Sequence, residues 1–153
     1  MGDSVESRGS TLRVAGEKFS AEVLSGLRGE PRVEFRGTIS SSNPAEVLNP
    51  FVEAVHAQLV ARRASEISVD FLDLEFCNSS GFKSFVFWLE QIRRLPEAQR
   101  YRLRFISSAG RRWQRVSLLA LTSFGGENVT IETLSTSRPA CPVRPWPAGG
   151  AQS

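Results

Sequence analysis

The hydrophobic period of the chain changes abruptly between Val69 and Leu89, in the segment VDFLDLEFCNSSGFKSFVFWL. Its first part, up to Phe76, is rich in β-branched and aromatic residues, as is typical of a buried strand. After the turn-forming residues 77–81, apolar residues recur three or four positions apart, at Phe82, Phe85, Val86, Leu89 and Ile92. The pattern predicts a buried strand, a tight polar turn and a helix whose apolar face packs back on the sheet.

Similar patterns predict strands and helices along most of the remaining chain. Alternating apolar and polar residues predict strands at 18–24, 32–39, 66–72, 101–106 and 129–132, the first two paired as a hairpin. Gly37, inside the second of these, suggests a bulge or a close backbone approach. Helical spacing predicts a helix from Pro50 to about Arg63, a second over 80–95, and a third that contains Trp113, Val116, Leu119 and Ala120. We expect only a short turn at 44–48, because proline disfavours the helical conformation in the residue before it.

The order of these elements is strand–strand–helix–strand–helix–strand–helix–strand, which is typical of the α/β class. We therefore expect a single domain with a mixed β-sheet of four to five strands and three main helices packed against it. Residues 1–15 are predicted to be a disordered N-terminal segment, and the domain is predicted to span residues 16–134. Residues 135–153 are rich in proline, serine and glycine and are predicted to form a disordered tail.

The composition is typical of a globular protein. With 153 residues, of which 41% are hydrophobic and 23% charged, the chain is long enough for one domain with a substantial core. Its two cysteines, Cys77 and Cys141, do not form a disulfide framework. No apolar run has the roughly 18–20 residues that a membrane span needs. The N-terminal residues MGDSVESRGS lack the apolar centre of a secretory signal, so we expect a cytoplasmic protein that does not enter a membrane.

Arginine is concentrated in one part of the chain. Between Arg93 and Arg115 there are eight arginines and a single acidic residue, Glu97. Clustered positive charge can be the footprint of a nucleic-acid site, but this run lacks interleaved aromatic platforms. We therefore favour a solvated face, or an acidic protein partner, over nucleic acid.

The turn at 77–81 is the best candidate for a site. Ser79 and Ser80 occupy positions typical of a helix N-cap, where a side-chain oxygen accepts from a free backbone amide. A hydroxyl there faces the positive end of the helix dipole, where added negative charge is tolerated. Helix capping alone would also explain both serines.

Two aromatic residues follow the turn. The helix stripe already fills the core face, so at least one of Phe87 and Trp88 should lie partly exposed as a contact for a partner. The alternative is that neighbouring loops or the tail cover both side chains.

The sequence offers little for catalysis. Ser80-Gly81-Phe82-Lys83 has the Ser-x-x-Lys spacing of penicillin-recognising enzymes, but the companion motifs are absent. His56 is the only histidine, so neither a catalytic triad nor a zinc site can be assembled. No phosphate-binding glycine loop is present. Cys77, beside the helix start, could have a lowered pKa, but inert buried packing is commoner. We expect no enzyme activity, no metal and no cofactor.

The segment DFLDLEFCNSSGFKSFVFWL resembles the centre of the STAS domain, the fold of bacterial anti-sigma-factor antagonists. The residues in register with the family's strand and its Asp-Ser-Ser-Gly motif are Asp70, Phe76, Ser79, Ser80 and Gly81. The element order also matches, so the resemblance covers roughly residues 17–133. The variant Asn-Ser-Ser-Gly, with WQRVSL at 113–118, is similar to a branch of STAS-like bacterial regulators.

The resemblance implies a STAS-like fold and a regulatory function in signal transduction through protein–protein interaction. In the antagonists, a serine kinase of the anti-sigma type phosphorylates the first serine of the motif, and a PP2C-type phosphatase reverses this. The matching phosphorylation candidate is Ser79, with Ser80 as the second choice. The residues expected to bind the partner are Asn78, Ser79, Ser80, Gly81, Lys83, Phe87 and Trp88.

Asn78 departs from the family motif, which has aspartate at this position. Asparagine keeps the turn-forming capacity but loses the charge that a kinase could recognise. Two alternatives therefore stay open: a constitutive scaffold or interaction module that is never phosphorylated, and a STAS-like module that binds a small ligand such as a nucleotide or a lipid. A homodimer is compatible with each of them.

Overall fold

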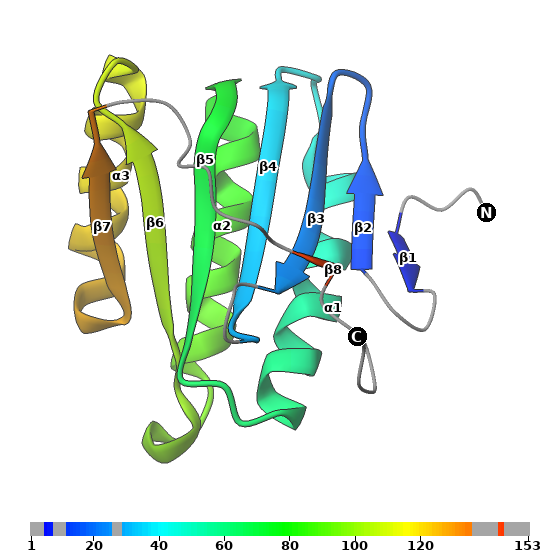
Figure 1. Ribbon diagram of the computed structural model, residues 1–153, viewed down its shortest axis with the longest axis vertical. Helices are drawn as coiled ribbons and strands as arrows, with labels where there is room; N and C mark the ends of the chain where they lie inside the picture. The colour runs from blue at the N-terminus through cyan, green and yellow to red at the C-terminus, as the bar shows by residue number, and fades with distance from the viewer. Residues whose placement is uncertain (1–4, 8–11, 26–28, 136–143, 146–153) are drawn as a thin grey trace.

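A computed structural model describes residues 5–7, 12–25, 29–135 and 144–145 of the chain. Its α-helices all lie on one face of a mixed β-sheet (Figure 1). This confirms the α/β class that the alternation of elements predicts. The strands are β1 (Val5–Ser7), β2 (Leu12–Ala15), β3 (Phe19–Ser25), β4 (Pro31–Ile39), β5 (Glu66–Cys77), β6 (Arg102–Ser108), β7 (Val129–Leu134) and β8 (Arg144–Pro145). The helices are α1 (Ala45–Ala61), α2 (Ser79–Arg93) and α3 (Arg112–Gly125), with two 3-10 helices, η1 (Glu97–Gln99) and η2 (Gly126–Asn128).

The sheet combines an antiparallel part and a parallel part. Its strands are ordered β1-β2-β3-β4-β5-β6-β7, and β8 pairs with β3. Pairing is antiparallel from β1 to β4 and for β8, and it is parallel from β4 to β7. Parallel strands need crossover connections, which here are α1, α2 and α3. The carboxyl ends of β4, β5 and β6 therefore meet at one edge of the sheet, where α/β proteins bind their ligands.

Aromatic side chains from the sheet, α1 and α2 form the centre of the core. The ring of Phe35 in β4 contacts those of Phe51, Phe71 and Phe85, with centroids 5.2–6.3 Å apart. Phe105 in β6 extends the cluster and lies 5.4 Å from Phe71. All of these side chains are fully buried, and each aromatic pair adds roughly 0.5–1.5 kcal/mol to the burial of the rings. The cluster fixes β5 and α2, the two elements on either side of the predicted turn.

Helix α1 is continuous, so the predicted break between a turn at 44–48 and a helix from Pro50 is wrong. Pro50 lies inside the helix and removes one backbone hydrogen bond to Glu46. Both residues are exposed, so water can reach the carbonyl group that is left free. Fully buried Leu48 and Phe51, on either side of the proline, each stabilise the helix by roughly 1.5–3 kcal/mol, enough to outweigh the defect. No helix in the described part of the chain combines the length and the apolar character that crossing a membrane requires.

The sheet has more strands than the four to five predicted. Strand β2 lies inside the segment 1–15 that was expected to be disordered, and its Leu12 and Val14 are 3% exposed. The folded domain therefore begins at or before Leu12 rather than at residue 16. The other unpredicted strands, β1 and β8, have three and two residues, too few for a hydrophobic period to be recognised. Strand β8 lies in the predicted tail, of which residues 136–143 and 146–153 are outside the described residues.

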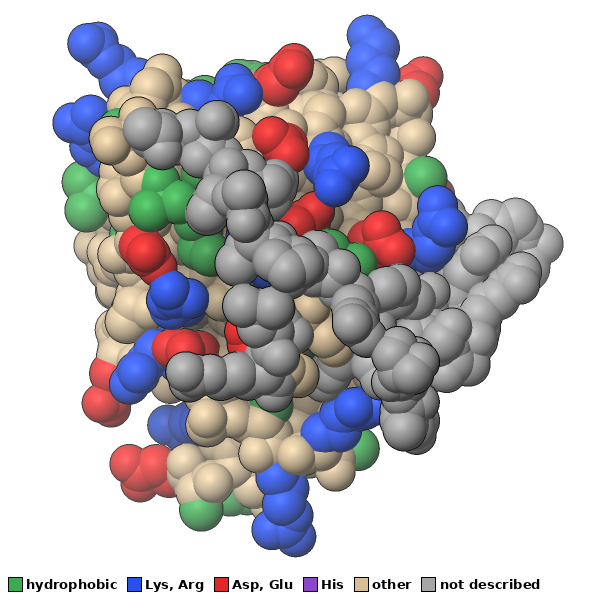
Figure 2. Space-filling model, viewed as in Figure 1, with side chains coloured by type: hydrophobic (Ala, Val, Ile, Leu, Met, Phe, Trp, Pro, Cys, Tyr) green, Lys and Arg blue, Asp and Glu red, His purple; other side chains and the backbone are tan. Residues whose placement is uncertain are grey.

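The face of the sheet opposite the helices carries acidic and basic side chains interspersed (Figure 2). Ion pairs link neighbouring strands there: Arg32 lies 2.6 Å from Asp70, and Arg104 pairs with Glu132. One member of the arginine-rich segment is therefore used to join β6 to β7.

Candidate functional site

The predicted turn joins the end of β5 to the start of α2, and Asn78 organises it. The Asn78 Oδ1 atom accepts a hydrogen bond of 2.8 Å from the amide of Gly81, which makes Asn78 the N-cap of α2. Its Nδ2 atom donates to the Ser41 carbonyl at 3.0 Å, and its backbone amide donates to the Ile39 carbonyl at 2.9 Å. Asn78 therefore caps the helix and also ties it to the end of β4. The prediction that Ser79 or Ser80 is the cap is wrong.

Because Asn78 is the cap, Ser79 and Ser80 become the first two residues of α2. The Ser79 side chain is exposed and that of Ser80 is half-buried. Within the described residues, neither hydroxyl takes part in a hydrogen bond. Both hydroxyls lie at the positive end of the helix dipole. The fold therefore leaves an accessible hydroxyl, Ser79, where a negative group would be electrostatically favoured.

Gly81 allows α2 to start in direct contact with β4. A Cβ atom added at Gly81 would lie 2.5 Å from Cγ2 of Ile39 and 3.0 Å from Sγ of Cys77. Both distances are far below van der Waals contact, so any larger residue would push the helix start away from the sheet. Gly81 is buried, and its lack of a side chain positions the turn against the sheet.

Strand β5 is irregular next to the turn, and this exposes Phe76. Its parallel register with β4 shifts between Glu34 and Arg36 and again between Gly37 and Thr38, and at each shift the extra residue lies in β5. At Gly37 the close backbone approach is confirmed, because an added Cβ atom would lie 2.2 Å from the carbonyl oxygen of Lys18. Each shift moves the following side chains relative to the core face. Phe76, placed by its pattern in the buried strand, is 45% exposed and packs on Trp113 with ring centroids 6.1 Å apart.

The first turn of α3 satisfies backbone groups that the irregular part of β5 leaves unpaired. Fully buried Gln114 donates from Nε2 to the carbonyls of Phe71 and Leu74, at 2.7 and 3.0 Å. Its Oε1 atom accepts from the Ser108 amide at 2.8 Å. Trp113 donates from Nε1 to the Glu75 carbonyl at 2.8 Å. These two residues fix α3 beside the turn. The sequence signal that could have identified Gln114 is a polar residue on the buried face of an amphipathic helix.

The helix residues predicted to contact a partner are placed differently from one another. Lys83 is exposed and Phe87 is half-buried, but Trp88 is fully buried and donates from Nε1 to the Tyr101 hydroxyl at 2.9 Å. Trp88 is therefore a core residue, and its assignment to the partner surface is wrong. The buried face of α2 is rotated from the predicted one, and it consists of Gly81, Ser84, Phe85, Trp88, Leu89 and Ile92.

The two remaining reactive side chains are held in unreactive environments. Cys77 is 7% exposed, and burial raises the pKa of its thiol to about 12, so it stays protonated at neutral pH. His56 lies half-buried on α1, with Nδ1 2.6 Å from the Tyr101 hydroxyl, and desolvation lowers its pKa. No group of three or more potential metal ligands exists in the part of the chain that the structure describes.

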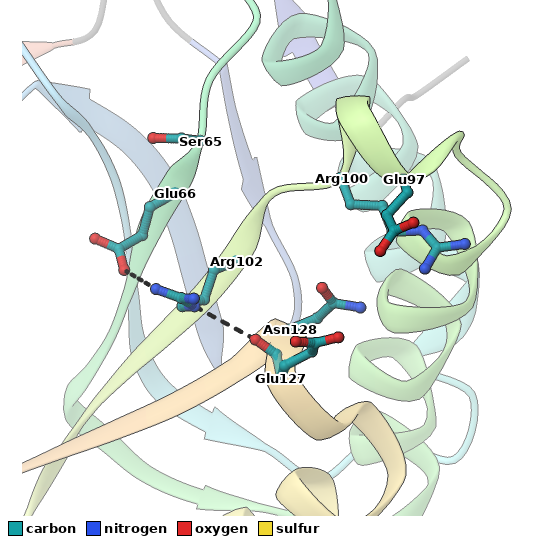
Figure 3. A pocket seen from close by; sticks show the side chains of 7 residues that line it. All are labelled: Ser65, Glu66, Glu97, Arg100, Arg102, Glu127 and Asn128. Carbon is teal, nitrogen blue, oxygen red and sulfur yellow. Dashed lines mark hydrogen bonds and ion pairs between the residues drawn. The ribbon is translucent and has the colours of Figure 1, made fainter.

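A pocket of about 400 Å³ lies at the other end of the parallel strands, away from the turn (Figure 3). Its two arginines already bind backbone carbonyls: Arg100 those of Arg93 and Leu95, and Arg102 that of Glu127. Three glutamates offset the arginine charges, so the pocket favours neither anions nor cations. It is lined by Ser65, Glu66, Glu97, Arg100, Arg102, Glu127 and Asn128.

Comparison of the chain with protein-family models and with curated proteins finds no match. The geometry of the turn is therefore the main basis for a functional conclusion.

Proposed function

We propose that the chain is a STAS-like bacterial regulatory module that acts by binding a protein partner through the turn at 78–81. The resemblance of the strand–Asn-Ser-Ser-Gly–helix segment to anti-sigma-factor antagonists is the origin of this proposal. The arrangement of β3 to β7, an antiparallel hairpin followed by parallel strands with helical crossovers, supports it.

The observation that carries the proposal is the state of Ser79. This serine is exposed at the start of α2, and the cap that would otherwise use its hydroxyl is provided by Asn78. A phosphate on Ser79 would add about −1.5 to −2 charges at the positive end of the helix. The charge would leave the domain folded but would repel or block a partner docked on the turn. Ser79 is therefore suited to be a binding switch.

The surface beside Ser79 has features of a protein interface. Phe76, 45% exposed and supported by Trp113, offers an aromatic anchor, and Lys83 adds a positive charge one turn along α2. The partner implied by the resemblance is a serine kinase of the anti-sigma type, with a PP2C-type phosphatase that restores the free hydroxyl. Phe76 is therefore the aromatic residue that contacts the partner, in place of Trp88, which the sequence predicted for this contact.

The test compares Ser79→Ala with Ser79→Asp for binding of an anti-sigma-type serine kinase purified from the same cells. We expect Ser79→Ala to retain the wild-type affinity and Ser79→Asp to weaken it by about tenfold or more, as expected for a charge buried in an interface. Ser123→Asp, which adds the same charge on an exposed face of α3, is the matched control and should bind normally. Equal binding by the two Ser79 variants would refute the switch.

One structural detail favours a constitutive scaffold as the second candidate. Asn78 donates to the Ser41 carbonyl, and an aspartate at this position has no donor for that bond. Asparagine is therefore explained by the fold alone, without any kinase. Intact-mass measurement of protein purified from its own cells separates the two functions, because a scaffold carries no phosphate under any growth condition.

A further inference from the structure

The outward face of α3 is apolar, and most of it stays exposed in the part of the chain that the structure describes. Val116 is 67% exposed, Leu119 58% and Phe124 37%. With exposed Ala120 these residues follow helical spacing and form what we call the α3 stripe. The opposite face of α3 already supplies its contacts with the sheet, through Gln114, Leu118, Leu121 and Gly125. The α3 stripe is therefore not needed for the fold, and contiguous exposed apolar surface of this kind marks interaction sites.

Arginines lie at both ends of the α3 stripe, and one acidic residue, Glu127, lies three residues beyond Phe124. Arg112 and Arg115 are exposed and are the only charged residues of α3. Neither takes part in an ion pair among the described residues. Beside the other end of the stripe, the Arg93 guanidinium lies 5.5 Å from the centre of the Phe124 ring. The first turn of α3 has no acidic residue, so the positive end of its dipole is also uncompensated.

We propose that the α3 stripe binds an acidic amphipathic helix of a protein partner. An apolar face flanked by acids would cover Val116 and Leu119 and place carboxylates near Arg112 and Arg115, as in other helix-on-surface complexes. The stripe spans the nine residues from Val116 to Phe124, so it would accommodate about two turns of a partner helix at about 1.5 Å per residue.

An acidic helix matches the charge of the α3 stripe better than two alternative occupants, the C-terminal residues 135–153 and a second copy of the chain. The C-terminal residues 135–153 contain Arg138 and Arg144 and no acid. A second copy would bring another α3, which also has no acidic residue, against this one. Both would leave Arg112 and Arg115 facing further positive charge. The α3 stripe is also formed by a different element from the Ser79 turn, so this site goes beyond the proposed function.

The test uses the full chain and fluorescein-labelled designed peptides of about 18 residues, long enough for several helical turns. The acidic peptide has leucine at helical spacing and glutamate elsewhere. A second peptide replaces each glutamate by lysine, and a third scrambles the acidic sequence. Fluorescence anisotropy measures the dissociation constants. We expect the acidic peptide to bind at least about tenfold more tightly than either control, because both apolar and charge matching are then present.

Substitutions on α3 should change this preference in a defined way. Val116→Ser with Leu119→Ser should abolish acidic-peptide binding, and Arg112→Glu with Arg115→Glu should transfer binding to the lysine peptide. These residues are exposed, so the fold is retained, which circular dichroism checks. Arg13→Glu, an exposed charge reversal on β2, and Ser79→Asp should leave binding unchanged.

Three results would overturn the proposal. The first is equal binding of the acidic and scrambled peptides, and the second is acidic-peptide binding that survives the α3 substitutions. The third is sedimentation of the full chain as a dimer that Val116→Ser with Leu119→Ser converts to a monomer, which would identify the occupant as a second copy. Because Ser79→Asp is a control here, failure of the switch and failure of the α3 site are distinguishable.

Discussion

Asn78 shows how one side chain can set both the shape and the chemistry of a turn. Its carbonyl oxygen caps α2 and its amide group holds the segment after β4, so no other side chain is needed to close the turn. Aspartate could replace the first bond but not the second, because an ionised carboxylate has no donor. The consequence is that Ser79 keeps a free hydroxyl. At the scale of single residues, the cap makes the candidate switch available.

This division of roles predicts the stability of variants at the turn. Asn78→Ala loses both side-chain bonds and should lower the free energy of unfolding by about 1–2 kcal/mol. Asn78→Asp keeps the cap and loses only the bond to Ser41, so its loss should be clearly smaller. Ser79→Ala should change stability by less than about 0.5 kcal/mol. Urea unfolding measures all three. A loss for Ser79→Ala as large as that for Asn78→Ala would mean that the serine is the cap.

At the scale of elements, the sequence predicts the strand, the turn and the helix, but not the orientation of their side chains. The switch of period at residues 77–81 identifies all three because local pattern determines whether an element forms. The buried face of α2 depends on its neighbours, and contact with Tyr101 turns Trp88 inward. The exposure of Phe76 depends on bulges in β5 that Gln114 supports from more than 35 residues away. Bonds between residues so far apart in the chain cannot be recognised from the hydrophobic pattern of the sequence.

A chain of hydrogen bonds links α1 to α2 through Tyr101, just before β6, and it makes stability depend on pH. The Tyr101 hydroxyl accepts from Trp88 and bonds Nδ1 of His56, which serves as acceptor when the ring is neutral. Burial lowers the pKa of His56 from its ordinary value of 6.5 in the folded state only. Below pH 6.5, His56 is protonated to a greater extent in the unfolded chain than in the folded one. The stability due to neutral His56 is complete above pH 6.5 and is lost as the pH falls through the folded pKa.

The prediction is tested by urea unfolding at several values between about pH 5 and pH 7.5, the range in which histidine is the main group to titrate. The wild-type free energy of unfolding should decrease toward the acidic end, and His56→Gln should flatten this decrease because His56 is the only histidine. Parallel curves for the two proteins would show that His56 protonates equally in the folded and unfolded states.

At the scale of the whole molecule, alternation of strands and helices is enough to predict the α/β class, whereas the extent of the sheet is not. Helical crossovers need long periodic segments, which are visible in the sequence. The additional strands at the antiparallel edge are short, and β2 is surrounded by polar residues. Their place in the sheet follows from pairing between strands, of β1 with β2 and of β2 and β8 with β3, which no single segment specifies.

The N-terminal boundary of the domain can be tested by substitutions in β2, which precedes the boundary at residue 16 that the sequence predicts. Leu12 and Val14 point into the core beside α1 while Arg13 between them is exposed. Burying a side chain of this size contributes roughly 1.5–3 kcal/mol. Leu12→Ser with Val14→Ser should therefore lower the free energy of unfolding by about 3 kcal/mol or more, whereas Arg13→Ser should change it by less than about 0.5 kcal/mol. Thermal and urea unfolding measure the free energy of unfolding. If the double variant were as stable as Arg13→Ser, residues 12–15 would lie outside the cooperative unit. The domain would then begin at residue 16, as the sequence alone predicts.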